Sequence, residues 1–264
     1  MKLNLLKAIE PGGKADYGLD SPKTLRFYGL LILAELNLAL FFPFKSRYQK
    51  VRKWLRIGLF ASGLGHFVTL VVMYFASKQQ KFKHRDRLLD LADLQPNSRV
   101  LDIGSGRGLL AIGAAKRSPA MQVTAIDTWL SSDLSGNSEE ALRSNIDLEE
   151  VGGRVHVYEA DTRKLPFEAG CFDRIVSNLY LHNSGESKGV KGKIGGSFRQ
   201  QERARALGEI ARVLAPGGRV VISDFRYIDE DAAELECLGL SVTVHGPFRD
   251  IFPAQKILIA DKAA

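Results

Sequence analysis

The sequence predicts an α/β fold of alternating strands and helices, preceded by two long apolar helices. Between residues 99 and 260, short runs rich in Val and Ile alternate with longer segments that suit helices. A glycine-rich turn follows the first of these runs, as expected where a buried strand passes directly into a helix. Apolar stretches of 18 and 20 residues, at 27–44 and 57–76, come before this pattern.

Composition limits the class of partner. The chain has 264 residues, enough for one α/β domain and a smaller element. Its two cysteines, Cys171 and Cys237, offer no disulfide framework and favour a reducing compartment. Residues 1–87 carry 16 Lys and Arg against 5 Asp and Glu, whereas residues 88–264 carry 21 against 25. The basic charge belongs to the N-terminal third, so we expect no nucleic-acid partner.

The N-terminal third predicts a membrane hairpin. Residues 1–24 are polar and do not resemble a secretory signal. The two apolar stretches are each about as long as a bilayer core is thick, at ~1.5 Å per residue. We therefore expect a membrane-associated hairpin over 25–81, with membrane lipids as partners. The alternatives are a hairpin buried against the following domain and a homodimer formed through the hairpin.

Polar residues inside the apolar stretches carry further information. Glu35 and His66 lie at almost equal distances from a turn near residue 50, so we expect them to pair across the hairpin. A role in facing substrate is the alternative. The connector is rich in Lys and Arg, which conflicts with the usual placement of basic loops on the cytoplasmic side. A spanning hairpin and a shallow one both remain open.

The glycine turn lies at the centre of the predicted domain. A strand over 99–103 carries Asp102 and is followed by Gly104, Gly106 and Gly108, after which 109–117 reads as a helix. Backbone N–H groups at such a turn can approach a ligand closely. The spacing is G-x-G-x-G, which differs from the G-x-G-x-x-G pattern of dinucleotide sites.

Acidic residues end or follow the next predicted strands. The run 123–126 leads into Asp127, where an acidic side chain can bind ribose hydroxyls. Asp161 follows the strand predicted over 154–158. The run 172–178 leads into a segment with Tyr180 and His182, and a Pro-Gly-Gly turn precedes a strand over 219–224.

Five segments in this order, VLDIGSGRG, AIDTW, EADTRKLPF, FDRIVSNLYLHN and EIARVLAPGGRVVISDF, resemble the motifs of class I S-adenosylmethionine-dependent methyltransferases. The closest likeness is to the small-molecule branch. The resemblance implies a Rossmann-like, seven-stranded methyltransferase sheet over 82–264, with helices on both faces. It also implies that strands at 240–245 and 255–260 form an antiparallel pair.

The resemblance implies S-adenosyl-L-methionine as cofactor and S-adenosyl-L-homocysteine as product. Asp102 and the glycine turn would hold the amino-acid end, Asp127 the ribose, and Asp161 with Thr162 the adenine edge. Trp129 would cover the adenine or pack in the core. The cofactor-binding set that we expect is Asp102, Gly104, Ser105, Gly106, Gly108, Asp127, Thr128, Trp129, Asp161, Thr162 and Asn178, and we expect no metal site.

His182, with Tyr180 beside it, is the candidate catalytic residue, because an imidazole can take a proton from an acceptor near neutral pH. A structural role for His182 is the alternative, since methyl transfer depends mainly on alignment. Residues 185–199, rich in Gly and Lys, are either a solvated loop or a lid over the acceptor.

These observations predict a membrane-attached methyltransferase acting on a small or lipid-like acceptor, with its catalytic domain facing the cytoplasm. Two other classes are kept as alternatives: a dinucleotide-dependent oxidoreductase and a non-catalytic, S-adenosylmethionine-binding membrane module.

Overall fold

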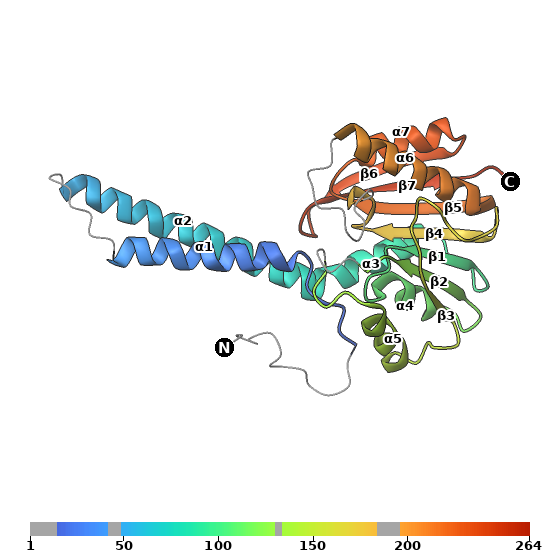
Figure 1. Ribbon diagram of the computed structural model, residues 1–264, viewed down its shortest axis with the longest axis horizontal. Helices are drawn as coiled ribbons and strands as arrows, with labels where there is room; N and C mark the ends of the chain where they lie inside the picture. The colour runs from blue at the N-terminus through green and yellow to red at the C-terminus, as the bar shows by residue number, and fades with distance from the viewer. Residues whose placement is uncertain (1–14, 42–48, 130–133, 184–195) are drawn as a thin grey trace.

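The computed structural model describes residues 15–41, 49–129, 134–183 and 196–264. A helical hairpin projects from an α/β domain (Figure 1). The hairpin consists of α1 (Pro22–Phe41) and α2 (Gln49–Phe75). A single π-helical turn, η1 (Ala76–Gln80), joins α2 to α3 (Lys81–Leu91), the first helix of the domain. A continuous helical run thus connects the hairpin to the domain.

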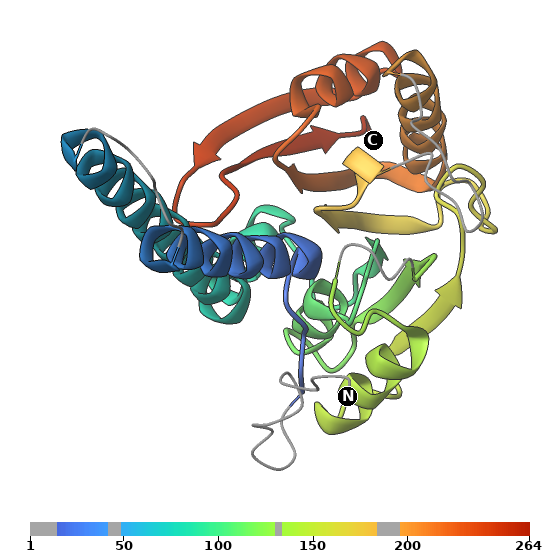
Figure 2. The same cartoon turned by 60° about the vertical axis from the view of Figure 1, so that its left-hand side comes forward.

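The two helices of the hairpin are long and apolar enough to cross a membrane, by length and composition. Only 11% and 17% of their most apolar windows are buried, unlike the core helices of soluble proteins. Large apolar side chains such as Leu30, Leu33, Leu64 and Phe67 are more than half exposed. Figure 2, like Figure 1, shows the hairpin pointing away from the domain.

The domain is built on a seven-stranded sheet with the order β3-β2-β1-β4-β5-β7-β6. Strands β1 to β5 pair in parallel, whereas β7 lies antiparallel between β5 and β6. The predicted sheet and its antiparallel last pair are thus confirmed. The strands are β1 (Arg99–Ile103), β2 (Gln122–Asp127), β3 (Val155–Glu159), β4 (Phe172–Asn178), β5 (Leu214–Asp224), β6 (Ser241–Phe248) and β7 (Gln255–Asp261).

Helices cover both faces of the sheet. On β1, Val100 packs into one core cluster and Leu101 and Ile103 into the other, because side chains alternate between the faces of a strand. One face carries α3, α4 (Leu109–Ala115) and α5 (Glu139–Leu148), and the other carries α6 (Gly196–Val213) and α7 (Ile228–Cys237). A short 3₁₀ helix, η2 (Leu181–Asn183), follows β4. The parallel strands bring their carboxyl ends to one edge of the sheet.

Candidate active site

A cleft of about 670 Å³ lies at this edge and gathers most of the predicted site residues. Its volume is in the range of small-molecule sites. Eleven of the predicted residues line it: Asp102, Gly104, Ser105, Gly106, Asp127, Thr128, Asp161, Thr162, Asn178, Tyr180 and His182. The candidate lid at 185–199 falls largely outside the described residues.

The glycine turn forms the floor of the cleft. Gly104 has φ +72°, and a Cβ at this position would lie 2.2 Å from the ring of Tyr180. Only glycine allows both the left-handed backbone and this close approach. Tyr180 therefore packs directly on the turn, and its hydroxyl accepts a hydrogen bond of 3.2 Å from Thr162 Oγ1. Burial raises the pKa of Tyr180 to about 12, so the phenol stays protonated at neutral pH.

Asp127 braces the turn from the end of β2. The Gly106 N–H donates to Asp127 Oδ2 at 2.7 Å, and the Trp129 N–H donates to Oδ1 at 2.7 Å. The indole Nε1–H of Trp129 donates to the Gly106 carbonyl at 3.3 Å. Both carboxylate oxygens of Asp127 thus accept backbone hydrogen bonds, one from the glycine turn and one from the chain just after β2.

Two predicted cofactor residues do not line the cleft. Trp129 is buried in the core behind the glycine turn, so it packs there and does not cover the opening. Gly108 has φ +89° at the start of α4, and a Cβ there would lie 2.4 Å from Leu142. Both residues shape the turn from its core side.

Asp102 is a buried carboxyl group of the cleft. Its Oδ2 accepts a 2.8 Å hydrogen bond from the Ala111 N–H, and its Oδ1 has no partner among the described residues. Burial, opposed by that hydrogen bond and helped by the charge of Asp127, raises the pKa of Asp102 to about 8. Ser105 Oγ and Asn178 Oδ1 are likewise buried without a partner in the described chain. These three orphaned oxygens call for hydrogen-bond donors from a ligand.

Asp161, the carboxyl group expected at the adenine edge, already forms hydrogen bonds with Arg163. Arg163 Nε donates to both oxygens of Asp161, at 2.8 and 3.0 Å, and this contact lowers the pKa of Asp161. The same guanidinium contacts Glu202 on α6. Asp161 therefore lines the cleft as an anion held by Arg163.

Glu159, at the end of β3, also lines the cleft. Glu159 was not predicted, although it ends its strand as Asp127 ends β2.

His182 pairs with Asp224, a partner that the sequence did not predict. Its Nδ1 lies 2.9 Å from Asp224 Oδ2, and Asp224 is 1% exposed. Because a carboxylate only accepts, Nδ1 carries the proton, and in the neutral imidazole this leaves Nε2 as an acceptor. Phe225 packs edge-on to the imidazole, with ring centroids 4.7 Å apart. The pair is therefore an oriented imidazole at the wall of the cleft.

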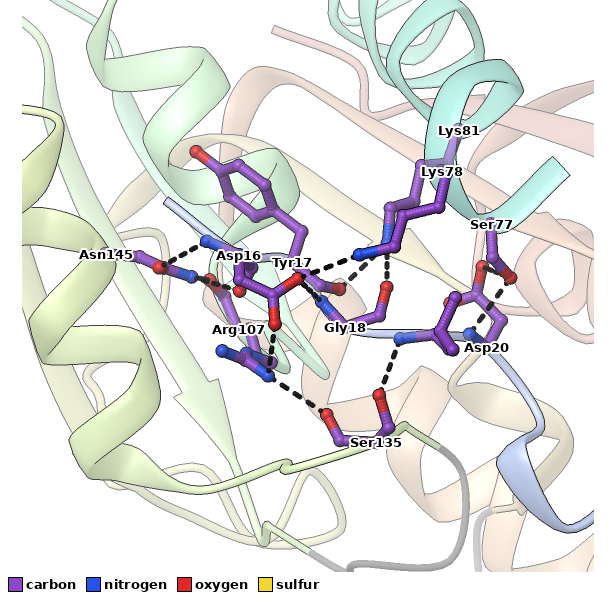
Figure 3. Close-up of polar contacts among 11 residues, drawn as sticks. Asp16, Tyr17, Gly18, Asp20, Ser77, Lys78, Lys81, Arg107, Ser135 and Asn145 are labelled. Atoms are coloured by element: carbon purple, nitrogen blue, oxygen red, sulfur yellow. Dashed lines mark hydrogen bonds and ion pairs between the residues drawn. The ribbon is translucent and has the colours of Figure 1, made fainter. Parts of the chain in front are cut away.

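Segments distant in the sequence complete the cleft. Tyr17, Asp20 and Lys81 line it, as does the first turn of α1 with Lys23 and Thr24. None of these residues was predicted as part of the site. They come from the chain before α1, from the first turn of α1 and from the chain after α2, so both ends of the hairpin meet the cleft. Figure 3 shows Tyr17, Asp20 and Lys81 close together.

Known proteins resemble this chain over its central part. Residues 101–222 match a family model described as a methyltransferase domain. Over 141 residues the chain is 33% identical to the demethylmenaquinone methyltransferase of Thermus thermophilus, covering 53% of each protein. Over 131 residues it is 30% identical to the ubiquinone/menaquinone biosynthesis C-methyltransferase UbiE of Geotalea daltonii, covering 49% of this chain and 46% of that protein. The chain spans about half the length of these curated relatives.

Solved structures share the fold. The YcgJ protein from Bacillus subtilis aligns with TM-score 0.51 and 15% identity, over 69% of this chain and 99% of that one. An O-methyltransferase family protein from Burkholderia thailandensis aligns with TM-score 0.52 and 16% identity, over 91% of this chain and 72% of that one. Over residues 101–222 the chain is therefore similar to a methyltransferase domain, and its sheet has the fold of these solved structures.

Proposed function

We propose that this protein is a membrane-attached methyltransferase that uses S-adenosylmethionine and acts on a small lipophilic acceptor, with a quinone precursor as the first class to test. One observation carries the proposal. The cleft that holds Asp102, Asp127 and Asp161 is also lined by the first turn of α1, the apolar helix of the hairpin.

The chemistry of the cleft suits the cofactor. S-adenosylmethionine supplies a methyl group on a positively charged sulfur and also carries an ammonium group. The orphaned oxygens of Asp102, Ser105 and Asn178 would accept from that ammonium. Asp127 would accept from the ribose hydroxyls, as acidic residues at this position of doubly wound sheets do.

His182 would receive the proton that the acceptor loses. Asp224 fixes the imidazole so that Nε2 accepts, and both His182 and the neighbouring Phe225 line the cleft. An acceptor with an acidic hydroxyl or an activated ring carbon would place its proton near Nε2. Asp224 also stabilises the imidazolium that results.

The hairpin would hold the domain at the membrane surface. Its exposed leucines and phenylalanines find an apolar environment in a bilayer, where exposure carries no cost. Since Ser21, Lys23 and Thr24 line the cleft at the base of the hairpin, a lipophilic acceptor would reach the site from the membrane. The names of the two relatives, which concern ubiquinone and menaquinone, support an acceptor of this kind. The domain would face the cytoplasm, where the cofactor is made.

Binding and turnover experiments test the proposal. Purified protein is titrated calorimetrically with S-adenosylmethionine, S-adenosylhomocysteine and NAD. We expect binding of the first two, whereas binding of NAD alone would indicate an oxidoreductase. Transfer of labelled methyl groups is then measured with demethylmenaquinone in vesicles and with a total membrane lipid extract. Cofactor binding without any labelled lipid product would favour a non-catalytic binding module.

A further inference from the structure

The segment 15–20, which we name the strap, runs from α5 to the base of the hairpin (Figure 3). Asn145 on α5 donates from Nδ2 to the carbonyls of both Asp16 and Arg107, each at 2.9 Å. Arg107 belongs to the glycine turn, and its Nη1 contacts Asp16 Oδ2 at 3.1 Å. One amide side chain and one ion pair thus tie the strap to the cofactor turn.

The strap also pairs with the chain that follows β2. The Leu19 N–H donates to Ser135 Oγ at 2.7 Å, and the Ser135 N–H donates to the Leu19 carbonyl at 3.0 Å. Asp20 forms an antiparallel bridge with Leu134. This connection leaves β2 directly after Asp127, so the strap contacts two of the loops that carry the predicted cofactor residues.

Lys81 holds the strap from the hairpin side. Its side chain is buried, with the residue 6% exposed, and Nζ donates to the carbonyls of Tyr17 at 2.8 Å and Gly18 at 2.7 Å. A buried ammonium is costly unless it is hydrogen-bonded, so these two bonds are needed to keep it in place. Nearby, Ser77 Oγ donates to Asp20 Oδ2 and accepts from the Asp20 N–H, both at 3.0 Å.

The same residues border the cofactor cleft. Tyr17, Asp20 and Lys81 line it together with Asp102 and Asp127. The strap immediately precedes α1, and Lys81 comes just after the π-helical turn that ends the hairpin. The two ends of the hairpin are therefore joined to each other through a wall of the cleft.

We propose that Lys81 is a positioning residue for the cofactor: by holding the strap in the wall of the cleft, it makes both ends of the hairpin part of the cofactor site. This inference rests on the proposed function. Loss of the Lys81 contacts frees the strap, and the wall that it forms no longer confines a ligand. Since the effect is on binding, it changes the affinity for cofactor and leaves the transfer step itself unaltered.

The test replaces Lys81 by Met and measures the Kd of S-adenosylhomocysteine by calorimetry on the full chain in detergent. A hydrogen bond to a charged group corresponds to a factor of about 10 or more, so we expect the Kd to rise at least ~10-fold. We expect the KM for S-adenosylmethionine to rise while kcat at saturating cofactor stays unchanged. Hydrogen exchange of a peptide covering 15–24 should accelerate, with the β-sheet peptides unaffected.

Lys78→Met is the matched control. Lys78 contacts Asp16 of the strap at 3.3 Å but is 41% exposed, so its ion pair contributes little. We expect this variant to bind S-adenosylhomocysteine like the wild type. If Lys81→Met also binds like the wild type, the inference is overturned.

A second variant keeps the test decisive if Lys81→Met does not fold. Ser135→Ala removes the acceptor of the Leu19 N–H on the opposite side of the strap and leaves Lys81 intact. We expect weaker binding of S-adenosylhomocysteine, and an unchanged Kd would overturn the inference. Failure of the wild type to bind this ligand at all would instead refute the cofactor assignment on which both proposals stand.

Discussion

Glu35 Oε2 lies 2.9 Å from His66 Nδ1, and this contact joins the middle of α1 to the middle of α2. Ser62 Oγ donates to the other oxygen, Glu35 Oε1, at 2.7 Å. Gly63 lies beside Glu35, where a Cβ would be 3.5 Å from Oε2. The predicted pair is thus confirmed, and it sets how the two helices face each other in the hairpin.

Substitutions of Glu35 and His66 should have non-additive effects on the free energy of unfolding. Glu35→Gln removes the carboxylate charge and His66→Ala removes the imidazole, so the double variant should lose less than the sum of the single losses. We expect a coupling energy of about 1 kcal/mol, as for polar contacts between membrane helices. Unfolding of the full chain in mixed micelles measures it. Strictly additive losses would show that the contact does not stabilise the hairpin.

His182 and Asp224 should affect the transfer step. His182→Gln removes the oriented acceptor, and we expect kcat to fall about 100-fold, in the range for general bases. The KM for S-adenosylmethionine should change little. Asp224→Asn should lower kcat in the same direction, because it no longer enforces the tautomer with a free Nε2. Unchanged kcat in both variants would assign His182 a structural role.

Cofactor binding should release a proton from Asp102. With a pKa of about 8, this carboxyl group is mostly protonated at pH 7 in the free protein. A bound cation favours the ionised form and lowers the pKa, so about one proton should leave per cofactor bound. Calorimetry in buffers with different ionisation enthalpies measures the release at pH 7.

Two comparisons test this origin of the proton. The release should fade at pH 9, where Asp102 is already ionised, and it should disappear in Asp102→Asn, which keeps an oxygen for the Ala111 N–H. Equal release by the wild type and the variant would assign the proton to another group.

A charge on the exposed face of the hairpin should weaken membrane attachment. Leu64 on α2 is 64% exposed, and arginine at the centre of a membrane helix costs about 2.5–3.5 kcal/mol. We expect Leu64→Arg to reduce flotation with phospholipid vesicles by about 100-fold. Leu148→Arg, at a 46% exposed leucine on α5 of the domain, is the control and should float like the wild type. Equal flotation of both variants would exclude insertion of this face.

The order of elements and the centre of the site could be predicted from the sequence because the signals are local. The continuously buried run of β1, the left-handed glycines of the turn and the carboxylate that ends β2 each depend on a few neighbouring residues. The Glu35–His66 contact was predictable for a similar reason, since two helices joined by a short connector bring residues at equal distances from the turn together.

Contacts between side chains on distant segments of the domain could not be predicted from the sequence. His182 and Asp224 are 42 positions apart and meet because β4 and β5 are neighbours in the sheet. Trp129 was expected either to cover the ligand or to pack, and its indole bond to Gly106 places it behind the turn.

Local sequence therefore determined the strands, the glycine turn, its carboxylates and the apolar hairpin. Only the tertiary structure decided that Asp224 orients His182 and that Lys81 holds the strap, 63 and 64 positions away, in the wall of the cleft. The physical reason is that these hydrogen bonds form only when whole helices and strands pack together. The periodicity of the sequence predicts single elements and does not predict which of their side chains will meet.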